Sequence, residues 1–463
     1  VQVVRRTTAD RCTGRQARRR AGSPELGRTI EGVFWVAAYL AVILAPLAVM
    51  MVSPTPPGRS FLAELSVALA FVALAQTAVQ FLLIARYRHV TAPYGIDIIL
   101  KYHREMGLVA VGLLVAHPLL LVADRPAMAG LLDPFGGTAG TRLGNWALYA
   151  LVLLVVLSLA RKRIGLGYEH WRVTHALLGL AALGLAHGHI HLSARYAATA
   201  WKEWVLIAIS AVLVASFAWL RLAKPAFQLR RPWRVAAVEA ERGRTWNLAL
   251  EPEGHDGIGF RPGQFAWVCL SRTPYSVEEH PFSFSSSAEA GPRLEFAVEE
   301  LGDFTSRIGD VEPGRRAWLD GPHGSFSPDR APAAGYVFFA GGVGIAPFLG
   351  ILRTMADRGD PRPVLLFYGS PRWEDTPYRE ALAELADRLA LTVVYVIEEP
   401  PEGWTGERGV IDEALLARRL PREGIERMHF VCGPPPMMDA VEDALRARGI
   451  PRARIRSERF ELV

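Results

Sequence analysis

Long apolar runs occupy the first half of the chain and end near residue 222. Each run is 17 to 22 residues long and carries few charges. An α-helix needs about this length to cross a hydrocarbon layer of about 30 Å. The pattern therefore predicts six membrane-spanning helices, at residues 32–52, 65–85, 106–123, 143–160, 173–194 and 204–220.

Beyond residue 230 the apolar stretches become short and alternate with turns. Residues 233–327 are typical of short strands with frequent turns, which indicates a small antiparallel β-barrel. Residues 336–463 alternate strands with helices, which predicts a doubly wound α/β fold with a parallel sheet. The fold class is thus multi-domain, with an all-α six-helix transmembrane bundle first. The predicted segments are a basic tail (1–30), the bundle (31–224), the barrel (228–330) and the parallel sheet (331–463).

Basic residues gather on one side of the predicted spans. The tail carries eight arginines, and further basic clusters follow the second, fourth and sixth spans, whereas the intervening loops are poorer in them. The positive-inside rule then predicts a multi-pass protein of the cell (inner) membrane with both termini in the cytoplasm. A basic tail beside a span is a topology anchor rather than a nucleic-acid arm, so no nucleic-acid partner is expected.

The three cysteines are Cys12, Cys269 and Cys432, and they form no CxxC motif. This usage excludes a disulfide framework and a cysteine-ligated iron–sulfur cluster within the chain.

Two histidine pairs with the same spacing lie at the third and fifth predicted spans. His103 and His117 are 14 residues apart, as are His175 and His189. Fourteen residues are close to four helical turns, so each pair shares one face at a separation of about 21 Å. Imidazole ligates heme iron, and an ionisable residue inside a membrane span is a functional hypothesis by default. Because the two spans run in the same direction, we predict an inner heme on His103 and His175 and an outer heme on His117 and His189.

The fifth span ends in three histidines, of which one should face a heme. At about 100° per residue, His189 lies about 40° around the helix from His175, and His187 lies about 120° away. We therefore assign His189, with His187 as the alternative if the helix kinks. His191 is expected at the outer interface.

A glycine-rich turn, GGVGIAP, opens the predicted parallel sheet. Gly341, Gly342 and Gly344 follow an apolar strand, and Pro347 stands near the start of the next helix. Glycines there let the backbone approach a pyrophosphate, whose charge the helix N-terminus attracts. A second strand runs into a Cys-Gly-Pro turn in FVCGPPPMM (430–438). Two such turns in this order indicate a dinucleotide site.

These turns resemble those of the ferredoxin-reductase superfamily of flavoproteins, as do the segments RPGQF (261–265), HPFSFSS (280–286) and LGDFT (301–305). The resemblance covers about residues 233–463. It implies that the barrel binds FAD and that the parallel sheet binds NAD(P)H.

The resemblance also implies roles for single residues. The superfamily has a flavin motif, Arg-x-Tyr-Ser/Thr, where this chain has His280, Pro281, Phe282 and Ser283. It implies that His280 approaches the flavin phosphates, that Phe282 packs against the isoalloxazine ring, and that Ser283 bonds near its reactive nitrogen. The other implied contacts are Gly302 and Thr305 at the FAD pyrophosphate, Gly341, Gly342, Gly344 and Pro347 at the dinucleotide turn, Cys432, Gly433 and Pro434 beside the nicotinamide, Ser370 and Arg372 near a 2′-phosphate, and Phe460 over the flavin.

HPF followed by Ser looks like the NADPH oxidase and ferric reductase branch, in which a six-helix heme domain precedes the flavin domain. This second resemblance covers nearly the whole chain. It implies an NAD(P)H-dependent flavocytochrome that passes electrons through FAD and two b-type hemes to an acceptor outside the membrane. The equal 14-residue spacing looks more like ferric reductases, so a ferric chelate is the expected acceptor and oxygen is the alternative. NADPH is expected rather than NADH.

Two other functions are open at this stage. One is a membrane-anchored flavin reductase that serves a protein partner without heme transfer, and the other is a heme-based sensor or quinone-linked subunit with a degenerate flavin domain. The four-histidine pattern argues against the first, and the intact flavin and nucleotide motifs argue against the second. The chemistry belongs to the cofactors, so no catalytic acid, base or nucleophile is assigned.

Overall fold

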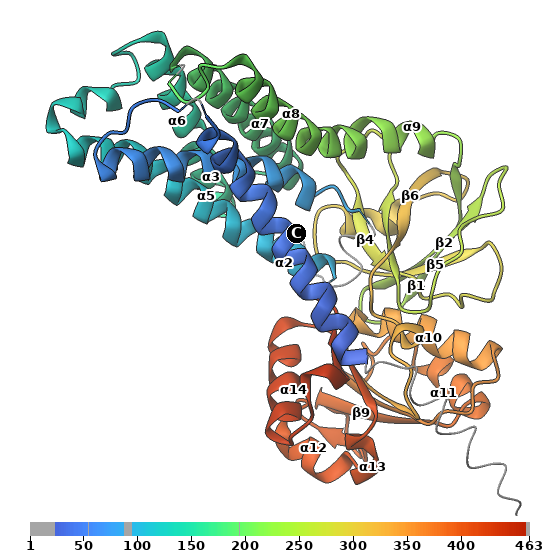
Figure 1. Cartoon of the computed structure of the whole chain (residues 1–463). Helices are drawn as coiled ribbons and strands as arrows, with labels where there is room; N and C mark the ends of the chain where they lie inside the picture. The colour runs from blue at the N-terminus through green and yellow to red at the C-terminus, as the bar shows by residue number, and fades with distance from the viewer. Residues whose placement is uncertain (1–23, 54, 88–94, 194, 460–463) are drawn as a thin grey trace, which may run out of the picture.

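Six long apolar helices form one part of the molecule, and two β-sheets form the other (Figure 1). The computed structural model describes residues 24–53, 55–87, 95–193 and 195–459. Within these ranges six helices are long and apolar enough to cross a membrane, which confirms the predicted number of spans. They are α2 (Pro24–Met51), α3 (Phe61–Leu83), α5 (Ile96–Asp124), α6 (Ala139–Ala160), α7 (Tyr168–Ser193) and α8 (Ala200–Ala218).

Helix α3 is the central helix of the bundle. In its most apolar window 56% of the residues are buried, against 28% or less in each of the other five spans. Leu74 and Phe81 of α3 share one apolar cluster with Leu183 of α7 and Leu213 of α8. The outer helices therefore leave much apolar surface exposed, as helices do when lipid covers them.

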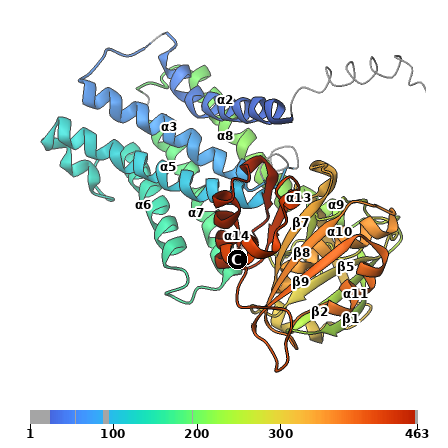
Figure 2. The same cartoon turned by 90° about the horizontal axis from the view of Figure 1, so that it is seen from below.

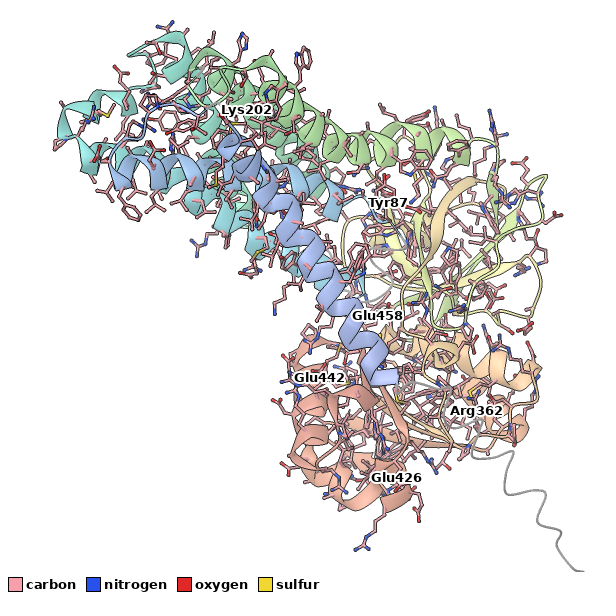
Figure 3. The ribbon with its side chains drawn as sticks, in the orientation of Figure 1. Tyr87, Lys202, Arg362, Glu426, Glu442 and Glu458 are labelled. Carbon is pink, nitrogen blue, oxygen red and sulfur yellow. The ribbon has the colours of Figure 1, made fainter. Side chains whose placement is uncertain are left out.

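Several polar side chains inside the bundle have hydrogen-bond partners. Lys202 of α8 is fully buried and donates to the Met50 carbonyl oxygen at 3.2 Å (Figure 3). Tyr39 donates to Gln76 Oε1 at 2.6 Å, and Gln76 donates in turn to the Met106 carbonyl oxygen at 3.2 Å. Such contacts offset the cost of placing polar groups away from water.

The first sheet is antiparallel and has the strand order β4-β3-β6-β1-β2-β5. A bridge between Phe284, just after β4, and Phe296 of β5 joins its two edges. Phe284 and Phe296 are fully buried in the enclosed core with Val235 and Leu248. This closure confirms the predicted antiparallel barrel. Its strands are β1 (Trp233–Glu241), β2 (Thr245–Pro252), β3 (Phe265–Cys269), β4 (His280–Ser283), β5 (Leu294–Glu299) and β6 (Arg316–His323).

The second sheet is parallel throughout, in the order β10-β9-β8-β7-β11-β12. Helices α10 and α11 pack against one face of this sheet through one apolar cluster. Helices α12, α13 and α14 pack against the other face through a second apolar cluster (Figure 2). This confirms the predicted doubly wound fold. The elements are β7 (Tyr336–Gly341), α10 (Ala346–Asp357), β8 (Val364–Arg372), α11 (Arg379–Arg388), β9 (Leu391–Glu399), β10 (Glu407–Arg408), α12 (Glu413–Arg419), α13 (Arg422–Ile425), β11 (Met428–Cys432), α14 (Pro435–Ala447) and β12 (Ile455–Ser457).

The barrel sits against one end of the bundle. Ile96 at the start of α5 packs on Phe265 and Trp267 of β3. Helix α8 also continues toward the barrel, through a π-helical turn and a short helix. The short helical segments of the chain are η1 (Pro126–Leu132), η2 (Trp219–Ala223), α9 (Lys224–Gln228), η3 (Thr305–Asp310), η4 (Pro328–Arg330), η5 (Gly342–Ile345) and η6 (Arg452–Arg454).

Candidate functional site

The predicted histidine pairs face one another between α5 and α7. The ring centres are 6.1 Å apart for His103 and His175, and 6.5 Å apart for His117 and His189. Two metal–imidazole bonds of about 2 Å, plus about 1 Å from each nitrogen to its ring centre, give a separation of about 6 Å. Both pairs are thus at a spacing that fits one bis-imidazole iron each.

Hydrogen bonds orient both rings of the outer pair. His189 Nδ1 donates to the Gly140 carbonyl oxygen at 2.8 Å. Ser66 Oγ donates to the His117 carbonyl oxygen, so it accepts from His117 Nδ1 at 2.8 Å. A carbonyl and a serine so engaged both act as acceptors, so Nδ1 carries the proton and Nε2 keeps its lone pair. This is the tautomer that a metal ligand needs.

In the inner pair a hydrogen bond orients only one of the two rings, that of His175. Ser158 Oγ donates to the Leu154 carbonyl oxygen at 2.7 Å. It therefore accepts from His175 Nδ1, which lies 3.2 Å away, and so orients that ring. His103 Nδ1 is buried and makes no well-formed hydrogen bond among the described residues, although the Gln80 backbone interacts with this ring. The two rings of the inner pair are therefore held differently.

The other histidines of α7 have neighbours on α8. His187 Nε2 lies 2.9 Å from Ser210 Oγ, and His191 Nδ1 lies 2.7 Å from Glu203 Oε1. His187 is therefore turned away from His117, whereas His189 faces it. This arrangement favours the prediction of His189 over His187.

A cavity of about 940 Å³ adjoins the inner pair. That volume is at the upper end of the range for small-molecule and cofactor pockets. Basic residues line it together with His103, His175 and many apolar side chains; they are Arg86, Arg104, Arg161, Lys162, Arg163, Arg172 and Arg221. Apolar walls with a basic rim suit a planar apolar group that bears carboxylates, as heme does.

The described residues include no group of three or more His, Cys, Asp or Glu side chains that could hold a bare metal ion. A heme needs only the two axial imidazoles from the protein, because the porphyrin supplies the other four ligands. The donor set in the bundle is thus compatible with heme.

The flavin motif lies on β4, at the side of the barrel that faces the bundle. His280 stacks on Phe304 with ring centres 4.1 Å apart, which joins the motif to the LGDFT segment. His280 Nε2 is buried without a partner among the described residues, so a cofactor atom can satisfy it. Burial lowers the pKa of His280. We therefore expect a neutral ring that acts by hydrogen bonding. Phe282 is half-buried, and Ser283 is buried.

The predicted pyrophosphate step forms a tight turn. Thr305 Oγ1 accepts hydrogen bonds from the backbone nitrogens of Leu301 and Gly302, at 2.9 and 3.0 Å. A Cβ on Gly302 would meet no atom within 4 Å, so the backbone there is open to a ligand.

The two nucleotide turns interlock at the ends of β7 and β11. A Cβ on Gly344 would lie 2.4 Å from the Cys432 carbonyl oxygen, and one on Gly433 would lie 2.9 Å from the Gly341 nitrogen. Gly342 has a φ of +52°, which disfavours other residues. Pro347 is in the first turn of α10, as its ring allows. This edge is the switch point at which such sheets bind ligands.

Cys432 is buried at the turn predicted to lie beside the nicotinamide, and the pKa of its thiol is raised by burial and by the nearby Glu458 carboxyl. Glu458 is itself buried and lies where the two sheets meet, since its backbone bonds to Val431 and its carboxylate would contact a Cβ on Gly324 (Figure 3). The sequence prediction did not include Glu458. Phe460 falls outside the described residues.

The residues predicted near a 2′-phosphate lie at the end of β8. Ser370 is buried and donates to the Arg372 carbonyl oxygen at 3.1 Å. Arg372 is more than half exposed and forms ion pairs with Glu399 at 3.2 Å and Asp375 at 3.8 Å. Exposed ion pairs of this kind are weak, so a phosphate can displace them.

A polar junction between bundle and barrel was also absent from the prediction. Glu279 accepts from Arg86, Arg172 and Arg221, each near the end of a different membrane helix. Burial alone would raise the pKa of Glu279, but the arginines outweigh it and lower the pKa to about 2. The only signal in the sequence was a carboxylate directly before the flavin motif.

Two family profiles match the chain. The profile described as "Ferric reductase like transmembrane component" matches residues 69–186, and the profile described as "Oxidoreductase NAD-binding domain" matches residues 338–443. The first covers three of the four predicted heme ligands, and the second covers both nucleotide turns.

Curated relatives match about half of the chain. The reductase component of propane 2-monooxygenase from Rhodococcus jostii (strain RHA1) is 31% identical over 236 residues, which are 49% of this chain and 62% of that protein. The probable electron transfer subunit of dihydroorotate dehydrogenase B (NAD(+)) from Methanopyrus kandleri is 30% identical over 220 residues, or 48% of this chain and 76% of that protein. A solved cytochrome P450 reductase from Amycolatopsis is 26% identical with a TM-score of 0.44, covering 50% of this chain and 69% of the other. The chain thus spans less than two thirds of the first of these relatives.

Proposed function

We infer that this chain, which belongs to the ferric reductase and NADPH oxidase type of membrane oxidoreductases, carries electrons across a membrane. In this proposal NAD(P)H is oxidised at the parallel sheet and an acceptor is reduced at the far end of the bundle. The family and the sheet architecture make it an NAD(P)H-dependent flavin oxidoreductase. The route through two hemes and the acceptor are our proposal.

The observation that carries the proposal is the matched pair of imidazole sites. Both are spaced for a bis-imidazole iron, and they lie at two levels of the same two helices. One site opens to a cavity that the flavin barrel closes, because Trp267 and Val277 of the barrel contribute to its lining. A chain of cofactors from the barrel to the far end is the simplest use of this arrangement.

The cofactors supply the redox chemistry: FAD accepts a hydride and releases single electrons, which the heme irons transfer one at a time. The protein binds and orients them. His103 and His175 would hold the inner heme, and His117 and His189 the outer heme. The glycine turns at Gly341 and Gly433 would admit the dinucleotide.

The basic residues at the barrel end support a cytoplasmic location for the barrel. The acceptor is then outside the cytoplasm, and we propose a ferric chelate. Oxygen is the other candidate, because the same outer site can deliver one electron to either.

An anaerobic titration tests the proposal. NADPH or NADH is added to the detergent-purified protein, and flavin and heme absorbance are followed. We expect two low-spin b hemes to be reduced after the flavin, and a ferric chelate to reoxidise them. Purified protein without heme, or flavin reduction that never reaches heme, would contradict electron transfer and favour a flavin reductase with a membrane anchor. Faster reoxidation by oxygen, with superoxide formed, would instead assign an oxidase.

NADPH is the proposed donor. Arg372 would face a 2′-phosphate once its pairs with Glu399 and Asp375 open. Replacing Arg372 with Ala should raise KM for NADPH and leave KM for NADH unchanged. Equal effects on both nucleotides would assign this arginine no role in selecting between them.

A further inference from the structure

Glu279 connects three membrane helices to the barrel. It stands on the loop before β4, one residue ahead of His280. Its carboxylate accepts from Arg86 at 2.8 and 3.1 Å, from Arg172 at 2.6 Å and from Arg221 at 3.1 Å. Arg86 follows α3, Arg172 lies in the second turn of α7 and Arg221 follows α8, so one carboxylate gathers three helix ends.

The contact with Arg172 also links the two predicted redox sites. Arg172 is three residues before His175, less than one helical turn away. It donates to Glu279 and, at 2.8 Å, to the Val277 carbonyl oxygen. One ion pair therefore holds the flavin motif beside the inner imidazole.

Arg86 makes a second link through an aromatic ring. Its guanidinium lies 3.6 Å from the ring centre of Trp267, and it also reaches Asp320 at 3.4 Å. Trp267 is on β3, opposite Pro281 of the flavin motif, and lines the inner cavity. The arginine that Glu279 holds is thus stacked between the barrel and that cavity.

The junction contains more positive than negative charge. Four cations, Arg86, Arg172, Arg221 and Lys224, meet two carboxylates, Glu279 and Asp320. The Arg86 and Asp320 side chains are 6% and 5% exposed, so water screens them little. Without the Glu279 charge, three guanidinium groups would face one another in the buried junction. Their repulsion would then move the barrel away from the helical bundle.

We propose that Glu279 is a positioning residue, which holds the flavin barrel against the inner heme site and so sets the rate of electron transfer between them. The proposal rests on the proposed function for its kinetic part. The other explanation is electrostatic tuning, in which the Glu279 charge only changes the redox potentials of the cofactors.

Stopped-flow absorbance on the anaerobic holoenzyme separates the two steps. In Glu279→Gln, flavin reduction by NADPH should stay within about twofold of the wild type, and heme reduction should slow roughly tenfold to a hundredfold. Glu278→Gln is the matched control, because Glu278 pairs with Arg307 of the barrel itself at 3.1 Å. That control should behave as the wild type, and a Glu279→Gln protein that does so as well overturns the proposal.

Arg172→Gln distinguishes positioning from tuning. Loss of a negative charge raises the nearby heme potential, and loss of a positive charge lowers it, so tuning predicts opposite effects of the two variants on the rate. Positioning predicts that both slow heme reduction. Opposite effects, matched by opposite shifts in the heme midpoint potential, would overturn the proposal.

Hydrogen–deuterium exchange tests docking without electron transfer. In Glu279→Gln the segment 276–283 should exchange faster than in the wild type, whether or not heme is reduced. If the wild type never reduces heme, the proposed function fails while this arm still reports on Glu279. If Glu279→Gln does not accumulate, Glu279→Asp and Arg172→Lys replace it, and unchanged exchange and heme reduction in both would overturn the proposal.

Discussion

The inner and outer histidine pairs share a spacing but not a setting. Both outer rings have an acceptor at Nδ1, and Gly144 allows α6 to approach His189 closely, since a Cβ there would lie 2.8 Å from Nδ1. Of the inner rings, only His175 has a well-formed hydrogen bond at Nδ1 among the described residues, and a large cavity with a basic rim lies beside both rings. The hydrogen bonds that orient the outer pair come from within the bundle, whereas the cavity beside the inner pair is lined in part by the barrel residues Trp267 and Val277.

The difference shows that two histidine pairs with the same spacing on α5 and α7 can have different surroundings. In the proposed function the inner site exchanges electrons with a flavin on the barrel, and the cavity beside that site reaches the barrel. The outer site has no such neighbour among the described residues, and hydrogen bonds within the bundle orient its rings.

The largest effect is expected when one ligand of each pair is removed. His175→Ala and His189→Ala should each reduce heme content from two per chain to one. His189→Ala should still allow reduction of the inner heme, whereas His175→Ala should block electron flow from the flavin altogether. A pyridine hemochrome assay and anaerobic NADPH reduction measure the two effects. His187→Ala serves as control and should keep both hemes; loss of one heme in this variant would move the assignment from His189 to His187.

A smaller, one-sided effect is expected at Gly144. In Gly144→Ala the new methyl group would press on His189, with a local cost of about 1–3 kcal/mol. We expect lower occupancy of the outer heme and normal occupancy of the inner one, measured by redox titration of the two hemes. Gly112→Ala is the control, because a Cβ there meets nothing within 4 Å. Equal losses at both hemes would show that the two sites are not packed independently.

A still smaller effect should follow removal of each serine that orients a ring. Ser158→Ala leaves His175 without its acceptor and should weaken inner heme binding about tenfold or more. Ser66→Ala should cost less, because His117 Nδ1 also lies 3.1 Å from the Ser66 carbonyl oxygen, which remains. Heme transfer to apomyoglobin measures both losses. A greater loss with Ser66→Ala would contradict the contrast between the pairs.

The smallest effect is expected when the pH is lowered, because the Glu279 carboxylate stays charged near neutral pH. The folded pKa of Glu279, about 2, is below its ordinary value of 4.5, so its contribution is complete above 4.5 and is lost as pH falls toward 2. The barrel should therefore stay docked from neutral pH down to about 4.5 and be released progressively as pH falls from there toward 2. Exchange of the segment 276–283 across this range measures the release. Glu279→Gln should lack this transition, and a wild-type midpoint near 6 would assign it to another group.

Much of the architecture could be predicted because it depends on local pattern. The six apolar runs, the short alternating strands and the two glycine turns are each recognised from consecutive residues. The helical bundle, the antiparallel barrel and the parallel sheet all form as predicted. The boundaries of the predicted segments, the ligand assignments and the cofactor contacts remain predictions, and Phe460 and most of the basic tail lie outside the described residues.

The sequence by itself determined the number of spans, the two kinds of sheet and the register of the histidines on each helix, because helical and strand periods are properties of consecutive residues. Only the tertiary structure decided which rings meet, which serines and carbonyls orient them, and that Glu279 gathers arginines from three helices. His189 and Gly140 are 49 residues apart in the sequence, and Arg86 and Glu279 are 193 residues apart. No local period specifies such contacts, because they exist only when separate helices and a sheet pack together.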